Sequence, residues 1–137
     1  MRAHRRTRQH AARVEYTLRR DDASARWARK LTSAFLAQGC ESPPEEHVDD
    51  ALLVVSELVA NATRHGRSDC RLRLHVHEGL LTVEVQDDSP QRPSSPLPTE
   101  TGESGRGIAL VRHLSRRFEV TGAPGGGKTV RAVLAAC

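Results

Sequence analysis

The chain has 137 residues, enough for one domain with its own hydrophobic core, and its net charge is +4. Aromatic residues make up only 3% of it, so that core must consist mainly of Leu, Val and Ala. No stretch approaches the ~20 apolar residues of a membrane-spanning helix, and no apolar run follows the basic N-terminus as in a secretory signal, so we expect no membrane association.

The basic charge is concentrated at the start of the chain. Residues 1–13 contain five arginines and no acidic residue, and without these five charges residues 14–137 have a net charge of −1. This pattern is typical of a solvated arm, and less often of an arm that contacts nucleic acid or an acidic partner. We predict a disordered tail at 1–13 and a single domain at 14–137.

Two helices are predicted after a short strand at 14–18. Apolar residues at helical spacing predict the first helix over 23–38, with an aspartate before it and a glycine after it as caps. The second and longest helix is predicted from about residue 45 to residue 65, with Ser42 as a candidate cap and Gly66 as its end.

The second helix carries two polar residues beside its apolar stripe. Glu57 and Asn61 are four residues apart, so they lie on one helix face, one turn from each other. Burying them without partners would cost about 1–3 kcal/mol each. A magnesium ion with phosphate oxygens would be such a partner, because an amide oxygen suits magnesium and a carboxylate can deprotonate a hydroxyl. The alternative is an amphipathic helix with a polar edge.

An antiparallel hairpin follows the second helix. Leu and Val alternate with polar residues over 70–77 and again over 81–86, which predicts one buried face and one wet face. The second strand ends at Asp87. Residues 88–104 are rich in Pro and Ser and lack periodicity, which favours a functional or disordered loop.

A glycine-rich turn at 102–107 leads into an apolar helical segment that starts at Ile108. Glycines allow the backbone to approach a ligand closely, and the amides at a helix N-terminus favour an anion such as phosphate. Taken alone, the turn is equally compatible with a tight connection. Two further strands are predicted over 118–121 and 129–134.

Residues 122–129 satisfy the P-loop pattern of Gly, four residues, then Gly-Lys-Thr. A P-loop requires a following helix and a second acid for magnesium, whereas the alternation after Thr129 predicts a strand. We therefore interpret these glycines as a hairpin turn.

The three cysteines, Cys40, Cys70 and Cys137, are odd in number and widely spaced. This pattern predicts neither a disulfide framework nor a zinc site, and it is typical of a reducing compartment. We expect a cytoplasmic protein.

The order of these motifs resembles the GHKL, or Bergerat-fold, ATP-binding domain of gyrase, Hsp90, histidine kinases and MutL. The motifs are ELVANA on a helix, a strand ending in Asp, a loose loop, GESGRG opening a helix, and GKTV entering the last strand. The match is nearest to the stand-alone anti-sigma factor or serine-protein kinase branch and covers about residues 14–135. It implies an α+β fold, a two-layer α/β sandwich with a mixed, mostly antiparallel sheet and helices on one face.

The resemblance implies that ATP and Mg2+ are the cofactors and assigns the site. Glu57 resembles the general base, Asn61 the magnesium ligand, and Asp87 the acid that accepts a hydrogen bond from the adenine amino group. The other residues implied in nucleotide binding are Arg64, His65, Gly105, Arg106, Gly107 and Thr129. One departure is Ser89, which stands where the family pattern has Gly.

The function implied is that of an ATP-binding regulator. It would transfer the ATP γ-phosphate to a serine or threonine of an anti-anti-sigma (STAS-type) partner, or sequester a sigma factor, or both. The alternative is a protein-interaction module with a nucleotide pocket but weak catalysis, which Ser89 favours. Related regulators form homodimers, for which the helix face with Trp27 is one candidate surface, although we expect Trp27 in the core. A nucleic-acid binder is disfavoured, because interleaved aromatics and a recognition helix are absent from the sequence.

Overall fold

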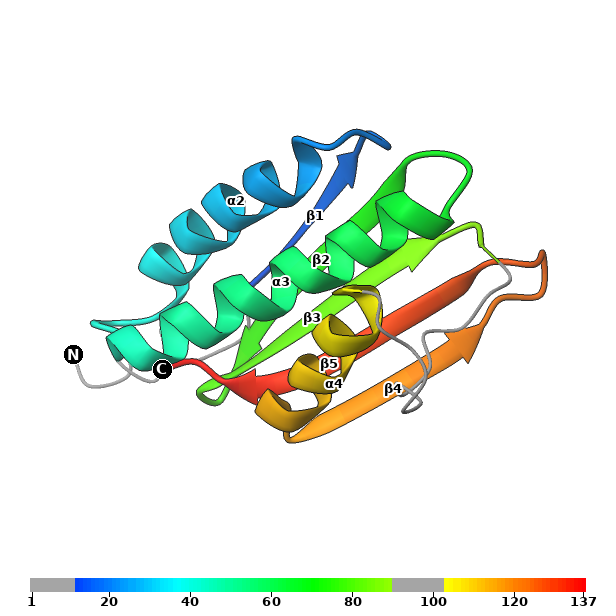
Figure 1. Cartoon of the computed structure of the whole chain (residues 1–137). Coiled ribbons are helices and arrows are strands. Elements are labelled where there is room, and N and C mark those ends of the chain that lie inside the picture. The colour runs from blue at the N-terminus through cyan, green and yellow to red at the C-terminus, as the bar shows by residue number, and fades with distance from the viewer. Residues whose placement is uncertain (1–11, 90–102) are drawn as a thin grey trace.

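The structure, a computed structural model, describes residues 12–89 and 103–137, with only the backbone for 103–106 (Figure 1). Its helices are α2 (Ser24–Gly39), α3 (Glu45–His65) and α4 (Glu103–Leu114). Its strands are β1 (Ala12–Leu18), β2 (Cys70–His77), β3 (Leu80–Asp87), β4 (Arg117–Gly122) and β5 (Lys128–Ala135). Each predicted helix and strand is therefore present, with ends shifted by a few residues.

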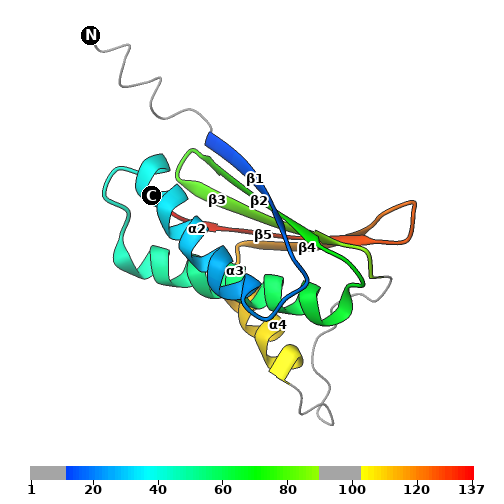
Figure 2. The same ribbon diagram turned by 90° about the horizontal axis from the view of Figure 1, so that it is seen from above.

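The strands form a five-stranded sheet in the order β1-β2-β3-β5-β4. Every neighbouring pair in it is antiparallel. Figures 1 and 2 show all three helices on one face of this sheet, with the other face open. The predicted two-layer sandwich is confirmed, and the sheet of the described residues is antiparallel throughout rather than mixed.

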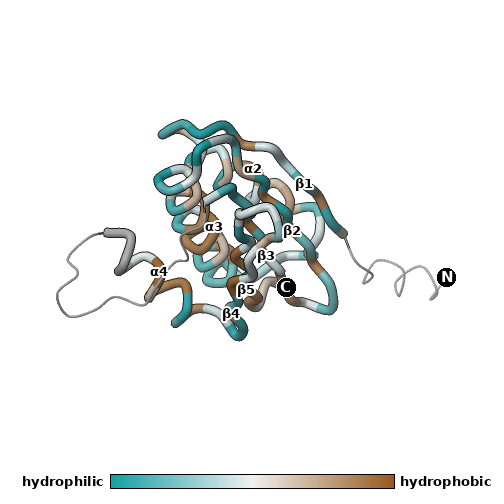
Figure 3. Tube along the Cα trace, turned by 90° about the vertical axis from the view of Figure 1, so that its right-hand side faces the viewer, coloured by the Kyte–Doolittle hydropathy of each residue, from teal (hydrophilic) through white to brown (hydrophobic). Residues whose placement is uncertain are grey.

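The core lies between α3 and the middle strands. Its members on α3 recur at spacings of three and four residues, so they form one stripe that faces the sheet. Figure 3 shows the hydrophobic colouring gathered between the helices and the sheet, and polar colouring outside. The buried apolar residues of α3 are Ala51, Val54, Val55, Leu58, Val59 and Ala62.

The ends of α3 are set by different groups at the two termini. At its start the cap position is Pro44, without a side-chain hydrogen bond, so the prediction of Ser42 as cap is wrong. Ser42 instead has a positive φ of 49° in the preceding turn. At its end the amide of Gly66 donates to the carbonyl of Ala62 at 2.7 Å, as expected for the residue that stops the helix.

Trp27 does not belong to the core. Its side chain on α2 is 57% exposed, and the Lys30 ammonium lies 5.4 Å from the ring centre. The buried stripe of α2 runs instead through Ser24, Ala28, Thr32 and Leu36, at spacings of four residues. Trp27 lies outside that stripe, so the prediction of a core position is wrong.

The predicted tail and loop lie mostly outside the described residues. β1 begins at Ala12, two residues inside the tail predicted at 1–13, and residues 1–11 lie outside the described residues. Most of the loop predicted at 88–104 likewise lies outside them, whereas α4 already begins at Glu103. Among the helices described, none combines the length and the hydrophobicity needed to cross a membrane.

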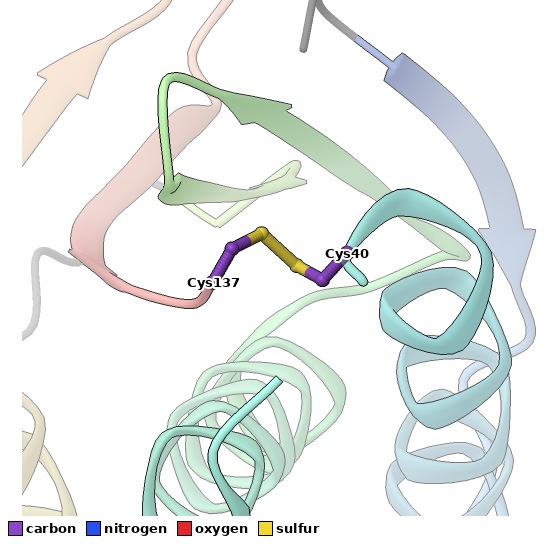
Figure 4. The surroundings of a disulfide bond; sticks show 2 residues. All are labelled: Cys40 and Cys137. Atoms are coloured by element: carbon purple, nitrogen blue, oxygen red, sulfur yellow. A yellow bond between two sulfur atoms is a disulfide. The ribbon is translucent and has the colours of Figure 1, made fainter. Parts of the chain in front are cut away.

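The structure contains a disulfide that the cysteine spacing did not predict. Cys40, just after α2, is bonded to Cys137, and their Cα atoms are 5.3 Å apart (Figure 4). The two residues are 97 positions apart in sequence, and the fold brings them together because β5 ends beside the α2–α3 connection. Cys70 is a free, buried thiol.

Truncation of the α3 stripe should destabilise the fold. Leu58 is 1% exposed, whereas Leu110 on α4 is 38% exposed. Leu58→Ala should therefore lower the free energy of unfolding by about 2–5 kcal/mol, because it leaves a cavity. The matched control Leu110→Ala should cost much less, and equal losses in urea unfolding would contradict the assignment of the core.

The Cys70 thiol should make stability depend on alkaline pH. Burial, and secondarily the Asp87 charge, raises the pKa of Cys70 from 9.0 to about 11. The unfolded chain therefore releases this proton first, and stability should fall as the pH rises from about 9 to about 11. Urea midpoints measured across that range should show this decline, and Cys70→Ala should reduce it; an unchanged slope would refute the assignment.

Candidate functional site

Glu57 and Asn61 lie on α3 beside its apolar stripe, as predicted. Asn61 is only 4% exposed, although it is polar. Glu57 is half-buried, and its carboxylate occupies the space that a side chain on Gly107 of α4 would fill. Because Gly107 has no side chain, the carboxylate can lie directly against the N-terminal half of α4.

The first turn of α4 contributes backbone amides to the same region. The first four amides of a helix have no acceptor within it, which here includes those of Gly105 and Arg106. Gly107 is the fifth residue of the helix, so its amide can bond within it. Gly107 makes room for the Glu57 carboxylate. The predicted role of Gly105 and Gly107 at the phosphates stays a prediction.

Asp87 ends β3 as a buried carboxylate, 5% exposed. Its Oδ1 accepts hydrogen bonds from the backbone amide of Ser89 at 2.7 Å and from Lys128 Nζ at 3.0 Å. Its Oδ2 lies 2.8 Å from the same ammonium. Lys128 is opposite Asp87 in the β3–β5 register and is 1% exposed, so the two charges form a buried ion pair.

Two glycines bring the backbone close to Asp87. A side chain on Gly66, at the end of α3, would meet the Asp87 Cβ at 3.5 Å and the Ala62 carbonyl at 2.7 Å. A side chain on Gly127 would overlap the Asp87 carbonyl oxygen. The end of α3, the end of β3 and the turn before β5 are therefore in contact.

Asp88 fixes the connection between α3 and β2. Its Oδ1 accepts the amide of Arg67 at 2.6 Å and its Oδ2 accepts the Ser68 hydroxyl at 2.9 Å. The Arg67 amide, followed by the Ser68 hydroxyl, lowers the pKa of Asp88 below its usual value. No motif in the sequence pointed to Asp88, yet Asp88 ties the end of β3 to the loop that follows α3.

Thr129 lies on the opposite face of the sheet from Asp87. Successive side chains of a strand alternate between the two faces, and Thr129 pairs with Gln86 rather than Asp87. The Gln86 side chain accepts a hydrogen bond from Arg73 on the open face, at 3.3 Å. The register therefore does not favour the predicted contact of Thr129 with a nucleotide, and it brings Lys128 to that position instead.

Arg64 and His65 occupy the last turn of α3, one turn beyond Asn61. Arg64 is exposed and His65 is half-buried. Basic residues at a helix C-terminus are favoured by its dipole whatever their function, so their predicted role at the phosphates stays a prediction. The Arg106 side chain lies outside the described residues.

The rejection of the P-loop is confirmed. Gly126 donates to Ala123 at 3.0 Å and Ala123 to Gly127 at 2.8 Å, which closes a turn between β4 and β5. A strand, not a helix, follows Lys128. The sequence reading gave Lys128 no role once the P-loop was rejected. Its spacing of two residues from Val130, and so on to Ala132 and Leu134, could have predicted that Lys128 shares their buried face.

The described residues supply too few ligands to hold magnesium by themselves, so a bound phosphate would have to supply the others. Within residues 12–89 and 103–137, no group of three or more His, Cys, Asp or Glu residues could hold a metal ion by itself. Magnesium characteristically takes one or two protein oxygens and completes its shell with phosphates and waters. The buried carboxamide of Asn61, one turn from Glu57, fits that use and would orient a metal–phosphate group against the start of α4.

Residues 3–134 match the histidine kinase-like ATPase domain, which covers nearly the whole chain. The chain belongs to this family. Membership confirms the predicted GHKL resemblance and implies an ATP-binding domain. The anti-sigma F factor of Pasteuria penetrans is 27% identical to the chain over 121 residues, which cover 78% of this chain and 79% of that protein.

Solved structures of other proteins support the fold. The RsbU and RsbW domains of a Mycobacterium tuberculosis protein match 91% of this chain with a TM-score of 0.69 and 18% identity, and the chain spans only 32% of that protein. A blue-light activated histidine kinase of Erythrobacter litoralis matches 82% of this chain and 59% of its own, with a TM-score of 0.54 and 26% identity. The SiaB–SiaC complex of Pseudomonas aeruginosa matches 98% of both chains, with a TM-score of 0.52 and 13% identity.

The glycine before β5 should be required for the site. Gly127→Ala places a methyl group on the backbone oxygen of Asp87, which cannot rotate away as a side chain could. We expect it to lower the free energy of unfolding by about 1–3 kcal/mol. Gly125→Ala in the same turn meets nothing within 4 Å and should change stability by less than about 0.5 kcal/mol. Equal urea midpoints for the two variants would contradict this close approach.

Proposed function

We propose that the protein is an ATP-dependent regulator of the anti-sigma factor type, which phosphorylates a serine or threonine of an anti-anti-sigma partner. The observation that carries the proposal is the placement of Glu57 against α4, one helical turn from the buried Asn61. Family membership and the similarity to an anti-sigma F factor support the nucleotide and the class of partner.

This geometry supports a direct transfer of the γ-phosphate to the partner. The partner's hydroxyl oxygen attacks the γ-phosphorus, the bond between that phosphorus and the β–γ bridging oxygen breaks, and ADP leaves. Glu57 takes the hydroxyl proton. The amides at the start of α4 would hold the phosphates, and Asn61 would hold magnesium, which would offset their negative charge. Arg64, His65 and Arg106 would add positive charge beside them.

Direct sequestration of a sigma factor is the second candidate function. Ser89 is buried and its amide is engaged by Asp87, so the segment after β3 starts from a constrained backbone. A nucleotide site with such a constrained backbone could bind ATP as a switch without efficient transfer. Binding of ATP without phosphorylation of any partner would favour this function over the kinase.

We place either function in the cytoplasm, where sigma factors act. In a reducing compartment Cys40 and Cys137 would be thiols, so the cysteine pair should respond to the redox state of its surroundings. Protein kept without reductant retains the Cys40–Cys137 disulfide, so a thiol assay in denaturant should detect one free thiol, that of Cys70.

Asn61 and Glu57 should have separable effects. Asn61→Ala should lower the affinity for a fluorescent ATP analogue in magnesium by roughly 10-fold or more, and leave the affinity in EDTA nearly unchanged. Glu57→Gln should keep magnesium-dependent binding but slow phosphoryl transfer by about 10²–10⁴-fold. Glu46→Gln, an exposed change at the start of α3, is the control.

Each of these two variants has one result that would contradict its assigned role. Unchanged magnesium dependence in Asn61→Ala would remove the metal assignment. Full transfer activity in Glu57→Gln, measured with radiolabelled ATP and candidate partners captured from the native extract, would remove Glu57 as the base.

A further inference from the structure

Three segments that are far apart in sequence meet around the disulfide. They are the connection between α2 and α3, the turn between β2 and β3, and the end of β5 (Figure 1). The backbone amides of Ala136 and Cys137 both donate to the carbonyl of Gly79 in the hairpin turn, at 2.9 and 3.1 Å. Backbone hydrogen bonds therefore hold the end of the chain to the sheet, and the bond from Cys137 to Cys40 ties it to the helices.

The connection between α2 and α3 has few other ties. Glu41 and Ser42 are exposed, and Ser42 has a positive φ of 49°, which is unfavourable for a residue with a side chain. Among the described residues, none makes a side-chain hydrogen bond or an ion pair with residues 41–46. The disulfide is therefore the covalent tie on which the position of this connection depends.

The two bonded sulfurs differ in their access to solvent. Cys40 is 7% exposed, whereas Cys137 is exposed. An attacking thiolate must reach one sulfur of a disulfide and displace the other, so it should reach Cys137 and release Cys40. Cys70 is 1% exposed, and burial raises its pKa to about 11, so this thiol stays protonated and takes no part in the exchange.

The backbone around both cysteines is held by bonds that do not involve sulfur. The Cys40 amide donates to the carbonyl of Leu36 at 2.9 Å, and the Cys137 amide donates to Gly79. The Cα atoms are 5.3 Å apart, within the usual range for a disulfide. The reduced thiols should therefore remain close enough to bond again without refolding of the chain.

We propose that Cys40 and Cys137 form a reversible thiol–disulfide switch, which ties the α2–α3 connection and the first turn of α3 to the end of β5 when oxidised and releases them when reduced. The inference goes beyond the proposed function and does not depend on nucleotide binding. It extends the expected redox response of the pair by naming the segment that the bond controls and the sulfur that reacts first.

Closure of the switch is a two-step exchange with a small-molecule disulfide, for which glutathione disulfide is the probe. The Cys137 thiolate attacks one sulfur of the probe and expels a glutathione thiolate, which leaves a mixed disulfide. The Cys40 thiolate then attacks the Cys137 sulfur and expels the second glutathione thiolate. The two cysteine thiols lose two electrons and two protons, and the probe takes up both as two thiols.

The first test measures whether the native protein exchanges. The full chain is equilibrated with mixtures of reduced and oxidised glutathione, quenched with acid, and assayed for thiols in denaturant. We expect one thiol at the oxidising end and three at the reducing end, with native circular dichroism at both. Cys70→Ala should keep the change of two thiols. A disulfide that survives excess dithiothreitol in the native protein, and is reduced only in denaturant, would be a permanent cross-link and would overturn the inference.

The second test locates the effect by amide hydrogen exchange. Reduction should speed exchange at the amides of Cys40 and Val48, whose acceptors are Leu36 and Pro44, by roughly 10-fold or more. The second half of α3 should change little. Cys137→Ser, an exposed change, should exchange like the reduced wild type in either buffer.

Equal exchange at these two amides in both redox states would show a bond without control over the connection and would overturn the inference. Unfolding of the whole reduced protein, as judged by circular dichroism, would show a cross-link needed for the fold and would overturn it too. Neither result bears on the proposed function, because no nucleotide is present in these measurements.

Discussion

The site depends on the packing of the apolar stripe of α3 against the sheet. Because that stripe follows one side of the helix, the polar residues beside it are fixed at its edge, where α4 and the end of β3 meet it. The directions of the Glu57 and Asn61 side chains are therefore set by the orientation of the whole helix. Their positions follow from the burial of Val55, Leu58 and Val59, all of them 1% exposed or less.

Three glycines are as important to the site as its polar side chains. Gly107 admits the Glu57 carboxylate beside α4, and Gly127 admits the backbone of Asp87 beside β5. Gly66 lets α3 end directly against β3. At Gly66 and Gly127 an added methyl group would overlap a backbone oxygen atom, and at Gly107 it would displace the Glu57 carboxylate, so glycine at these positions lets the three elements pack closely.

Charge is distributed unevenly between the faces of the sheet. On the open face, ion pairs such as Arg73–Glu15 at 2.7 Å are solvent-exposed and contribute little to stability. On the inner face, the Asp87–Lys128 pair is desolvated and located at the edge of the site. The disulfide joins the C-terminus to Cys40 near the start of α3, whereas Glu57 and Asn61 lie on the second half of this helix (Figure 1).

The helices, the strands and the position of Glu57 and Asn61 on one helix face could all be predicted from the sequence, and the two-layer arrangement from the family resemblance. The helices and strands follow from local periodicity, which each segment carries in its own residues. Three features could not be predicted in this way: the bond between Cys40 and Cys137, the exposure of Trp27, and the contact of Asp87 with Lys128 rather than Thr129. Those outcomes depend on strand register and on contacts between residues far apart in sequence, because a shift of one residue in register moves a side chain to the other face of the sheet.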